Sequence, residues 1–194
     1  LVARGKHLVI QFVSGRTLRV HLGMYGTWHH YALGTRWRRR PSTARIVLAT
    51  DRDVFVCFRP TKVDLIQNSH LTAHPLHHDL GPDLIGPPIS SHELLGRIQH
   101  YEQVSAYLDD LLLDQRIAAG IGNVYKSEIL FIYRLNPRLK VCDVPDEILL
   151  ELFDCARILL HDNLKGGPRI TTTWQRSDLP KRVDSHLWVY GRKK

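Results

Sequence analysis

The stretch that most constrains the fold is residues 111–131, which reads LLLDQRIAAGIGNVYKSEILF. Three leucines end one apolar helix, a glycine-rich turn follows, and a second apolar pattern begins near Asn123. Gly120 and Gly122 let the backbone bend tightly with little side-chain bulk. We expect Asn123 to start the second helix and to accept a hydrogen bond from the backbone two or three residues on. The free N–H groups of that first turn favour an anion, so the turn is predicted to bind a phosphate such as that of DNA.

The helix after the turn carries an acidic residue inside its apolar face. At 100° per residue, Glu128 falls in the middle of a stripe formed by Ile121, Val124, Tyr125, Ile129, Phe131 and Ile132. A buried carboxylate without a partner is costly, so we expect backbone N–H groups or an arginine to meet it. The alternative is that Glu128 lies at the edge of the stripe and reaches water.

Composition narrows the function classes. The chain has 194 residues, 43% of them hydrophobic, a net charge of +8 and twelve histidines. This charge points to a polyanionic partner, although only clustering and motifs decide whether that partner is nucleic acid. The sequence has no apolar run of membrane-spanning length and no signal-peptide pattern, which favours an intracellular, cytoplasmic protein.

The three cysteines do not form a recognisable framework. Cys57, Cys142 and Cys155 are odd in number, widely spaced and without a C-x-x-C pair. Neither a disulfide framework nor a zinc site follows from that spacing. We expect three buried free thiols.

The first part of the chain has the alternation of antiparallel strands. Residues 6–22 form one predicted hairpin with its turn at Ser14 and Gly15, and residues 46–50 and 54–58 form another. Lys6 stands at the entrance of the first hairpin. By composition alone, a solvated surface charge is favoured there.

Two loops of this part carry candidate nucleic-acid contacts. In HLGMYGTW, Gly23 and Gly26 bracket Met24 and Tyr25, and an apolar side chain on such a tip can wedge into a base stack. From the residues alone, Met24 folded into the core is the favoured alternative. Residues 35–40 read TRWRRR, which suits a phosphate backbone but equally a solvated loop.

A polar connector is predicted for residues 64–88, where prolines interrupt the pattern. It contains four histidines that could be imagined as metal ligands: His70, His74, His77 and His78. No matching set of cysteines or carboxylates accompanies them, so we favour loop and surface histidines over a metal site.

The second part is predicted to be helical. Helices are expected from Ser90 or Ser91, from 104 to 113, and from 144 to 164 with Pro145 at a first helical position. The chain closes on HLWVYGRKK, which has a strand-like pattern.

Taken together, these segments resemble the formamidopyrimidine-DNA glycosylase and endonuclease VIII family. The stretch at 111–131 resembles that family's helix-two-turn-helix, and RGKHLVIQF, HLGMYGTW, LTAHPLHHDLGPDL and LWVYGRK agree in the same order. HLGMYGTW and the connector lean toward the endonuclease VIII branch. The resemblance implies an α+β fold: an incomplete antiparallel β-sandwich with its connector in residues 1–82, then a helical helix-two-turn-helix domain in residues 83–194.

The resemblance also implies a function in DNA repair. The family excises oxidised bases from double-stranded DNA and cuts the abasic strand by β-elimination, and a monomer is expected. Lys6 matches the lysine assigned to proton transfer, and Met24 and Tyr25 match the loop that fills the gap left by the flipped base. Asn123 matches the asparagine that holds the lesion phosphate, and Lys126 lies where it would add a phosphate contact.

Two family features do not stand in this sequence, and one position departs from its relatives. The family nucleophile is an N-terminal proline followed by glutamate. In family members, the segment that matches LWVYGRKK is followed by a four-cysteine zinc finger. We therefore expect a fragment of a bifunctional glycosylase, without zinc of its own, that at most binds DNA. Gly23 stands where endonuclease VIII relatives often carry Gln. The alternative is a non-catalytic helix-two-turn-helix module that binds nucleic acid.

Overall fold

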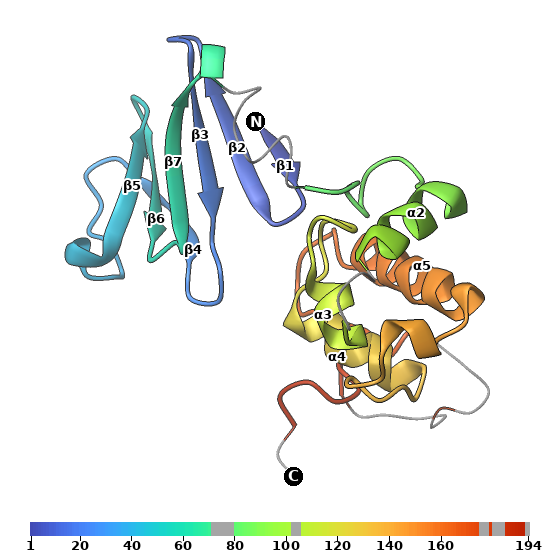
Figure 1. The fold of residues 1–194 in the computed structure, drawn as a ribbon. Helices are drawn as coiled ribbons and strands as arrows, with labels where there is room; N and C mark the ends of the chain where they lie inside the picture. Colours follow the sequence, from blue (N-terminus) through green and yellow to red (C-terminus); the bar gives the residue numbers. More distant parts are fainter. Residues whose placement is uncertain (71–79, 102–105, 175–178, 180–184, 193–194) are drawn as a thin grey trace. The chain divides into compact units, whose positions relative to one another are not determined.

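The computed structural model describes residues 1–70, 80–101, 106–174, 179 and 185–192. The chain forms two compact units, Leu1–His77 and His78–Lys194 (Figure 1). The first is built from strands and the second from helices. The expected α+β class is confirmed, and each unit is described by itself.

The first sheet of the β unit has four antiparallel strands in the order β1-β2-β3-β7. Their bounds are β1 Val2–Arg4, β2 His7–Phe12, β3 Arg16–His21 and β7 Lys62–Gln67. The predicted hairpin is confirmed, with Ile10 opposite Leu18. The connector prediction was wrong at its start, because residues 64–67 belong to β7. Aspartate is rare in strands, but the Asp64 carboxylate forms an ion pair at 3.3 Å with Arg19, which lies opposite it on β3.

The second sheet has three antiparallel strands in the order β4-β6-β5. Their bounds are β4 Thr27–Ala32, β5 Ala44–Ala49 and β6 Asp53–Phe58, with a short 3₁₀ turn, η1 Pro41–Thr43, before β5. The predicted hairpin of β5 and β6 is confirmed. Leu18 and Val20 of the first sheet pack with Ile46 and Cys57 of the second, which makes the unit an antiparallel sandwich.

The helical unit contains α2 Ser91–Tyr101, α3 Leu108–Leu113, α4 Asn123–Ile132 and α5 Asp146–Asp162. The predicted start of α2 is confirmed, since the Glu93 N–H donates to Ser90 Oγ at 3.1 Å. The helix α3 begins at Leu108, because Tyr107 is extended and bridges to Lys140; residues 104 and 105 of the predicted helix lie outside the described residues. Pro145 was predicted at the first helical position of α5, but it is the N-cap, one residue before that position.

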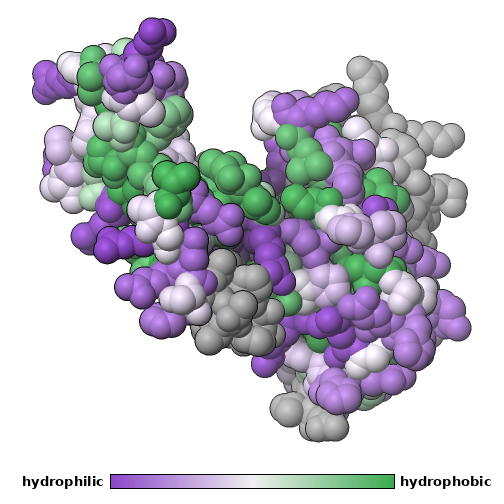
Figure 2. All heavy atoms as spheres, turned by 90° about the horizontal axis from the view of Figure 1, so that it is seen from above, coloured by the Kyte–Doolittle hydropathy of each residue, from purple (hydrophilic) through white to green (hydrophobic). Residues whose placement is uncertain are grey.

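The core of this unit gathers apolar side chains from all four helices and from the turn before α4. Among the helices described, none combines the length and the apolar character needed to cross a membrane. Figure 2 shows apolar side chains interspersed with hydrophilic ones on the face that it presents.

The predicted burial of Glu128 is confirmed, and backbone N–H groups are its partners. Its side chain has no exposed surface. One carboxylate oxygen accepts from the Trp188 N–H at 2.6 Å and from the Thr171 hydroxyl, and the other accepts from the N–H groups of Val189 and Tyr190 at 2.9 and 2.8 Å. The alternative of a water-exposed edge position was therefore wrong. The strand prediction for the closing segment was also wrong, because these N–H groups bond to the carboxylate and not to a neighbouring strand.

Replacing Glu128 by Ala should destabilise the helical unit by about 3–5 kcal/mol, because several buried donors lose their only carboxylate acceptor. The free energy of unfolding in urea, followed by far-UV circular dichroism, measures the loss. Glu151, exposed on α5, supplies the control, and Glu151→Ala should cost less than about 1 kcal/mol. Equal losses in the two variants would contradict the role given to Glu128.

Candidate nucleic-acid interface

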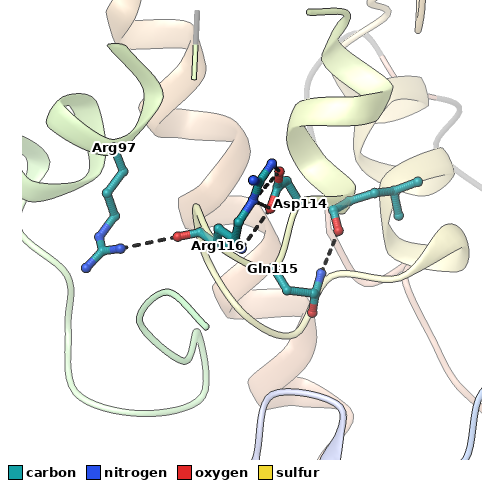
Figure 3. A network of polar contacts seen from close by, with 5 residues as sticks. Arg97, Asp114, Gln115 and Arg116 are labelled. Carbon is teal, nitrogen blue, oxygen red and sulfur yellow. Dashed lines mark hydrogen bonds and ion pairs between the residues drawn. The ribbon is translucent and has the colours of Figure 1, made fainter. Parts of the chain in front are cut away.

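The turn between α3 and α4 is held by the side chain of Gln115. Its Nε2 donates to the carbonyl oxygens of Leu113 and Ile121 at 2.8 and 3.0 Å, and its Oε1 accepts from the Gly120 N–H at 3.1 Å. Figure 3 shows the amide pointing toward the end of α3. Gly120 has φ +129°, a conformation that other residues rarely adopt. Gln115 was not singled out from the sequence. The only signal was a polar residue between two apolar segments of the chain.

Beside this turn the charged side chains neutralise each other. Arg116 forms an ion pair with Asp114, and Arg97 donates to the carbonyl oxygen of Arg116 at 3.2 Å (Figure 3). Arg97 also pairs with Glu93 at 3.2 Å. Partial burial alone would raise the pKa of the Asp114 carboxyl, but the hydrogen bonds from Arg116 outweigh it and lower that pKa. These arginines therefore stabilise the turn and are already paired.

Asn123 lies at the helix start, as predicted, and its side chain is exposed. The predicted cap was wrong: Gly122 is the N-cap, so Asn123 is already the first helical residue. The first helical hydrogen bond runs from the Lys126 N–H to the Gly122 oxygen at 2.9 Å. The N–H groups of residues 123, 124 and 125 therefore have no acceptor within the helix, and they point off its end. Lys126 lies less than one turn further on and is partly exposed.

Arg169 adds a positive charge near this helix start. Its guanidinium lies over the ring of Tyr125, 5.2 Å from the ring centre. Burial raises the pKa of the Tyr125 hydroxyl, and Arg169 opposes that rise. Arg169 could not be singled out from the sequence, because its contact joins the first turn of α4 to the segment after α5.

In the β unit, Lys6 belongs to a cluster of basic side chains. Lys6 lies in the turn between β1 and β2, and partial burial lowers the pKa of its ammonium group. The interpretation of Lys6 as a solvated surface charge was therefore wrong. Beside it, Arg19 Nε donates to His7 Nδ1 at 3.2 Å, and the ring centres of His7 and His21 lie 4.8 Å apart. Sequence reasoning missed His21, which ends β3 opposite His7.

The loop between β3 and β4 carries Met24 and Tyr25, the two residues predicted to fill the gap left by a flipped base. Met24 and Tyr25 are 70% and 75% exposed, so the alternative of Met24 in the core was wrong. Gly26 N–H donates to the Leu22 oxygen at 3.0 Å and closes the loop. Gly23 has φ +64°, and a Cβ there would lie 1.7 Å from Thr61 Oγ1. Any side chain at position 23, glutamine included, would therefore be strained on this backbone.

Other sequence predictions have mixed outcomes. His74, His77 and His78 lie outside the described residues, and His70 is in a short 3₁₀ turn, η2 Asn68–His70. Cys57 and Cys155 are buried free thiols as expected, but Cys142 is exposed. Burial raises the pKa of the Cys57 thiol to about 11. Within the described ranges, no three His, Cys, Asp or Glu side chains are grouped so as to hold a metal ion.

Comparison with known proteins identifies the family. The family described as "Formamidopyrimidine-DNA glycosylase H2TH domain" matches residues 80–173. Over 198 residues the chain is 31% identical to the formamidopyrimidine-DNA glycosylase of Rhizorhabdus wittichii, covering 97% of this chain and 69% of that protein. The chain belongs to the formamidopyrimidine-DNA glycosylase and endonuclease VIII family. A probable endonuclease 8 of Streptomyces coelicolor is 35% identical over 190 residues, covering 97% of this chain and 64% of the relative.

Solved structures of the family share the fold. Lactococcus lactis formamidopyrimidine-DNA glycosylase, bound non-covalently to DNA with an abasic site, matches with a TM-score of 0.71 at 20% identity. Its complex with FAPY-dG DNA matches with a TM-score of 0.73 at 19% identity. These matches cover 84% and 86% of this chain and 62% of each solved chain, so the sequence spans under two-thirds of those family members.

Acid should weaken the β unit through His7. Burial first, then the charges of Arg19, His21, Lys6 and Lys62, lower the pKa of His7 from 6.5 to about 4. Between these values the unfolded chain binds a proton that the folded chain does not, so stability falls as the pH falls from 6.5 to about 4.

His7→Gln should reduce this acid-induced loss of unfolding free energy by on the order of 2 kcal/mol, because the proton uptake on unfolding is removed. Urea titrations across that pH window, followed by tryptophan fluorescence, measure it. His92→Gln, an exposed histidine on α2, is the control and should leave the pH dependence unchanged. A pH dependence that is the same in His7→Gln and wild type would contradict the assignment.

Proposed function

We propose that this chain is the lesion-binding part of a base-excision DNA glycosylase that removes oxidised bases and cleaves the abasic strand by β-elimination. Family membership supports the class of enzyme. The observation that carries the proposal is Asn123, exposed at the first residue of α4 after a glycine turn that Gln115 holds in place. A phosphate placed there meets the Asn123 amide and N–H groups with no helical acceptor.

The basic cluster of the β unit suits proton transfer at the sugar. An amine with a lowered pKa spends a larger fraction of time neutral at physiological pH, so Lys6 can take up a proton as well as release one. Partial burial alone lowers the pKa of Lys6, because a charged ammonium group is less stable away from water. We assign Lys6 the role of the family's proton-transferring lysine.

The exposed loop suits the gap left by a flipped nucleotide. Met24 and Tyr25 present apolar and aromatic surface to solvent from a closed, glycine-bounded tip. Apolar side chains that enter a base stack repay part of the energy of unstacking. We assign Met24 and Tyr25 this role, and we assign Lys126 a supporting contact to the phosphate near Asn123.

The partner we propose is double-stranded DNA that contains an oxidised base or an abasic site, bound by a monomer. Solved relatives were crystallised with DNA containing an abasic site or FAPY-dG. The resemblance also implies zinc held by four cysteines in the full-length protein. The three cysteines of this chain do not fit such a site, since Cys57 and Cys155 are buried in different units and Cys142 is exposed. No step of the proposal uses zinc.

A non-catalytic nucleic-acid-binding module is the second candidate, since a helix start that displays Asn123 can hold a phosphate without any catalytic group. The two candidates differ in their preference for damage. A lesion-binding enzyme part should bind an abasic duplex more tightly than an undamaged duplex of the same sequence, whereas a plain binding module should not distinguish them.

Asn123→Ala should weaken binding to an abasic duplex by about 1–3 kcal/mol, because a hydrogen bond to a charged phosphate is lost. Fluorescence anisotropy with a labelled duplex measures the affinity across a salt titration. Asn136→Ala is the control, since Asn136 is exposed in the turn after α4. An unchanged affinity and salt dependence in Asn123→Ala would refute the phosphate contact.

Borohydride trapping on abasic DNA should give little or no covalent complex with this 194-residue chain, because its sequence holds no Pro-Glu pair to supply the family's nucleophile. Denaturing gel electrophoresis detects the cross-link. A strong cross-link would contradict this prediction and would identify another amine as nucleophile. Comparison of Lys6→Arg with Lys62→Arg then tests Lys6 first.

A further inference from the structure

The positive charge of the chain is concentrated in the β unit. Residues 1–77 carry twelve Lys and Arg against three Asp and Glu, a net charge of +9, whereas residues 78–194 carry a net charge of −1. Within the β unit, residues 27–59 alone hold seven arginines and two aspartates. One loop, residues 35–40, supplies four of these arginines: Arg36, Arg38, Arg39 and Arg40.

An aromatic anchor fixes this arginine loop, residues 35–40, on the sandwich. Trp37 stacks on Tyr31 with ring centres 6.4 Å apart and meets Phe58 edge-on at 5.9 Å. In the strand register, Tyr31, Val56 and Phe58 point to the opposite side of the second sheet from Trp28 and Cys57, which face the first sheet. The arginine loop therefore lies over the outer face of the second sheet.

Hydrogen bonds hold the loop on both sides of Trp37. The Arg38 N–H donates to the Tyr31 hydroxyl at 3.1 Å, and Thr35 N–H donates to the Ala32 oxygen at 3.1 Å. Thr43 closes the other side, where its N–H and hydroxyl both donate to the Arg40 oxygen, at 3.0 and 2.7 Å. A basic segment fixed in this way loses little conformational freedom when it binds.

Among the described residues, no carboxylate forms an ion pair that would neutralise the four arginines. All four are exposed, and no ion pair joins them to any carboxylate within the described part of the chain. Asp53, one of the two aspartates in residues 27–59, contacts His30 at 2.6 Å. By contrast, Arg97 and Arg116 of the helical unit are paired with Glu93 and Asp114. Like charges this close repel each other, a cost that a bound polyanion offsets.

We infer that the arginine loop is a contact for nucleic-acid phosphates that is independent of the lesion. This inference rests on the proposed function, which makes DNA the polyanion available to the chain. Guanidinium groups bind phosphates bidentately, and such contacts carry no sequence information. The loop would hold undamaged DNA and damaged DNA equally well, and it would raise the affinity for both without changing the preference for a lesion.

The test replaces Arg36, Arg38, Arg39 and Arg40 together by Ala and leaves Trp37 in place. Each phosphate contact contributes about 0.9 to the slope of log affinity against log salt, so the variant should lose roughly 2–4 from that slope. The loss should be equal for an abasic duplex and an undamaged duplex of the same sequence. The ratio of the two affinities should remain that of the wild type. Anisotropy titrations of both duplexes measure both quantities.

Two control variants separate charge from structure. Replacing the same four arginines by Lys keeps the charge and should retain most of the slope. Arg138→Gln removes a charge of the helical unit that is paired with Asp109 at 3.8 Å, and it should leave the slope unchanged. Tryptophan fluorescence of each variant verifies that the β unit is folded, which is expected because the four replaced side chains are exposed.

Three outcomes would overturn the inference. An unchanged slope in the four-fold Ala variant would show that the loop is only solvated. A loss confined to the abasic duplex would place the loop in the lesion site. A variant that keeps its DNA slope but no longer binds vesicles of anionic phospholipid would assign the loop to a membrane surface. Wild-type protein that binds neither duplex would instead refute the proposed function itself.

Discussion

The hydrogen bonds of the Gln115 side chain hold the turn on which the display of Asn123 depends. A glycine-containing turn loses much chain entropy on ordering, and its backbone groups need partners where they are buried. One amide side chain satisfies two carbonyl oxygens and one N–H across residues 113–121. With the turn fixed, α4 begins at Asn123, and its first N–H groups face outward.

Glu128 has a related role within α4 of the same unit. Its carboxylate replaces the neighbouring strand that residues 188–190 would otherwise need, and so a segment with strand-like sequence is ordered without a sheet. Gln115 holds the turn that leads into α4, and Glu128 lies within α4. The helix that carries the proposed phosphate contact is therefore also the element to which distant parts of the chain are hydrogen-bonded.

Features that depend on local periodicity were predictable from the sequence. The two hairpins, the helix start at Ser90 or Ser91 and the burial of Glu128 all followed from alternation or helical spacing. Strand β7 was not predicted, because Asp64 breaks the pattern and its partner Arg19 is 45 residues away. Likewise, the Asn123 cap was wrong, since a shift of one residue in the helix start turns a cap into a first helical residue.

Gly23 and Thr61 illustrate a dependence between two positions far apart in sequence. The threonine hydroxyl donates to the Leu22 oxygen at 3.3 Å and occupies the volume that any side chain at position 23 would need. A side chain at position 23 thus requires a different backbone and a smaller or reoriented residue at position 61. The two positions are expected to covary in evolution. A polar side chain at position 23, in the loop between β3 and β4, would therefore require coordinated substitutions at both positions and not a single one.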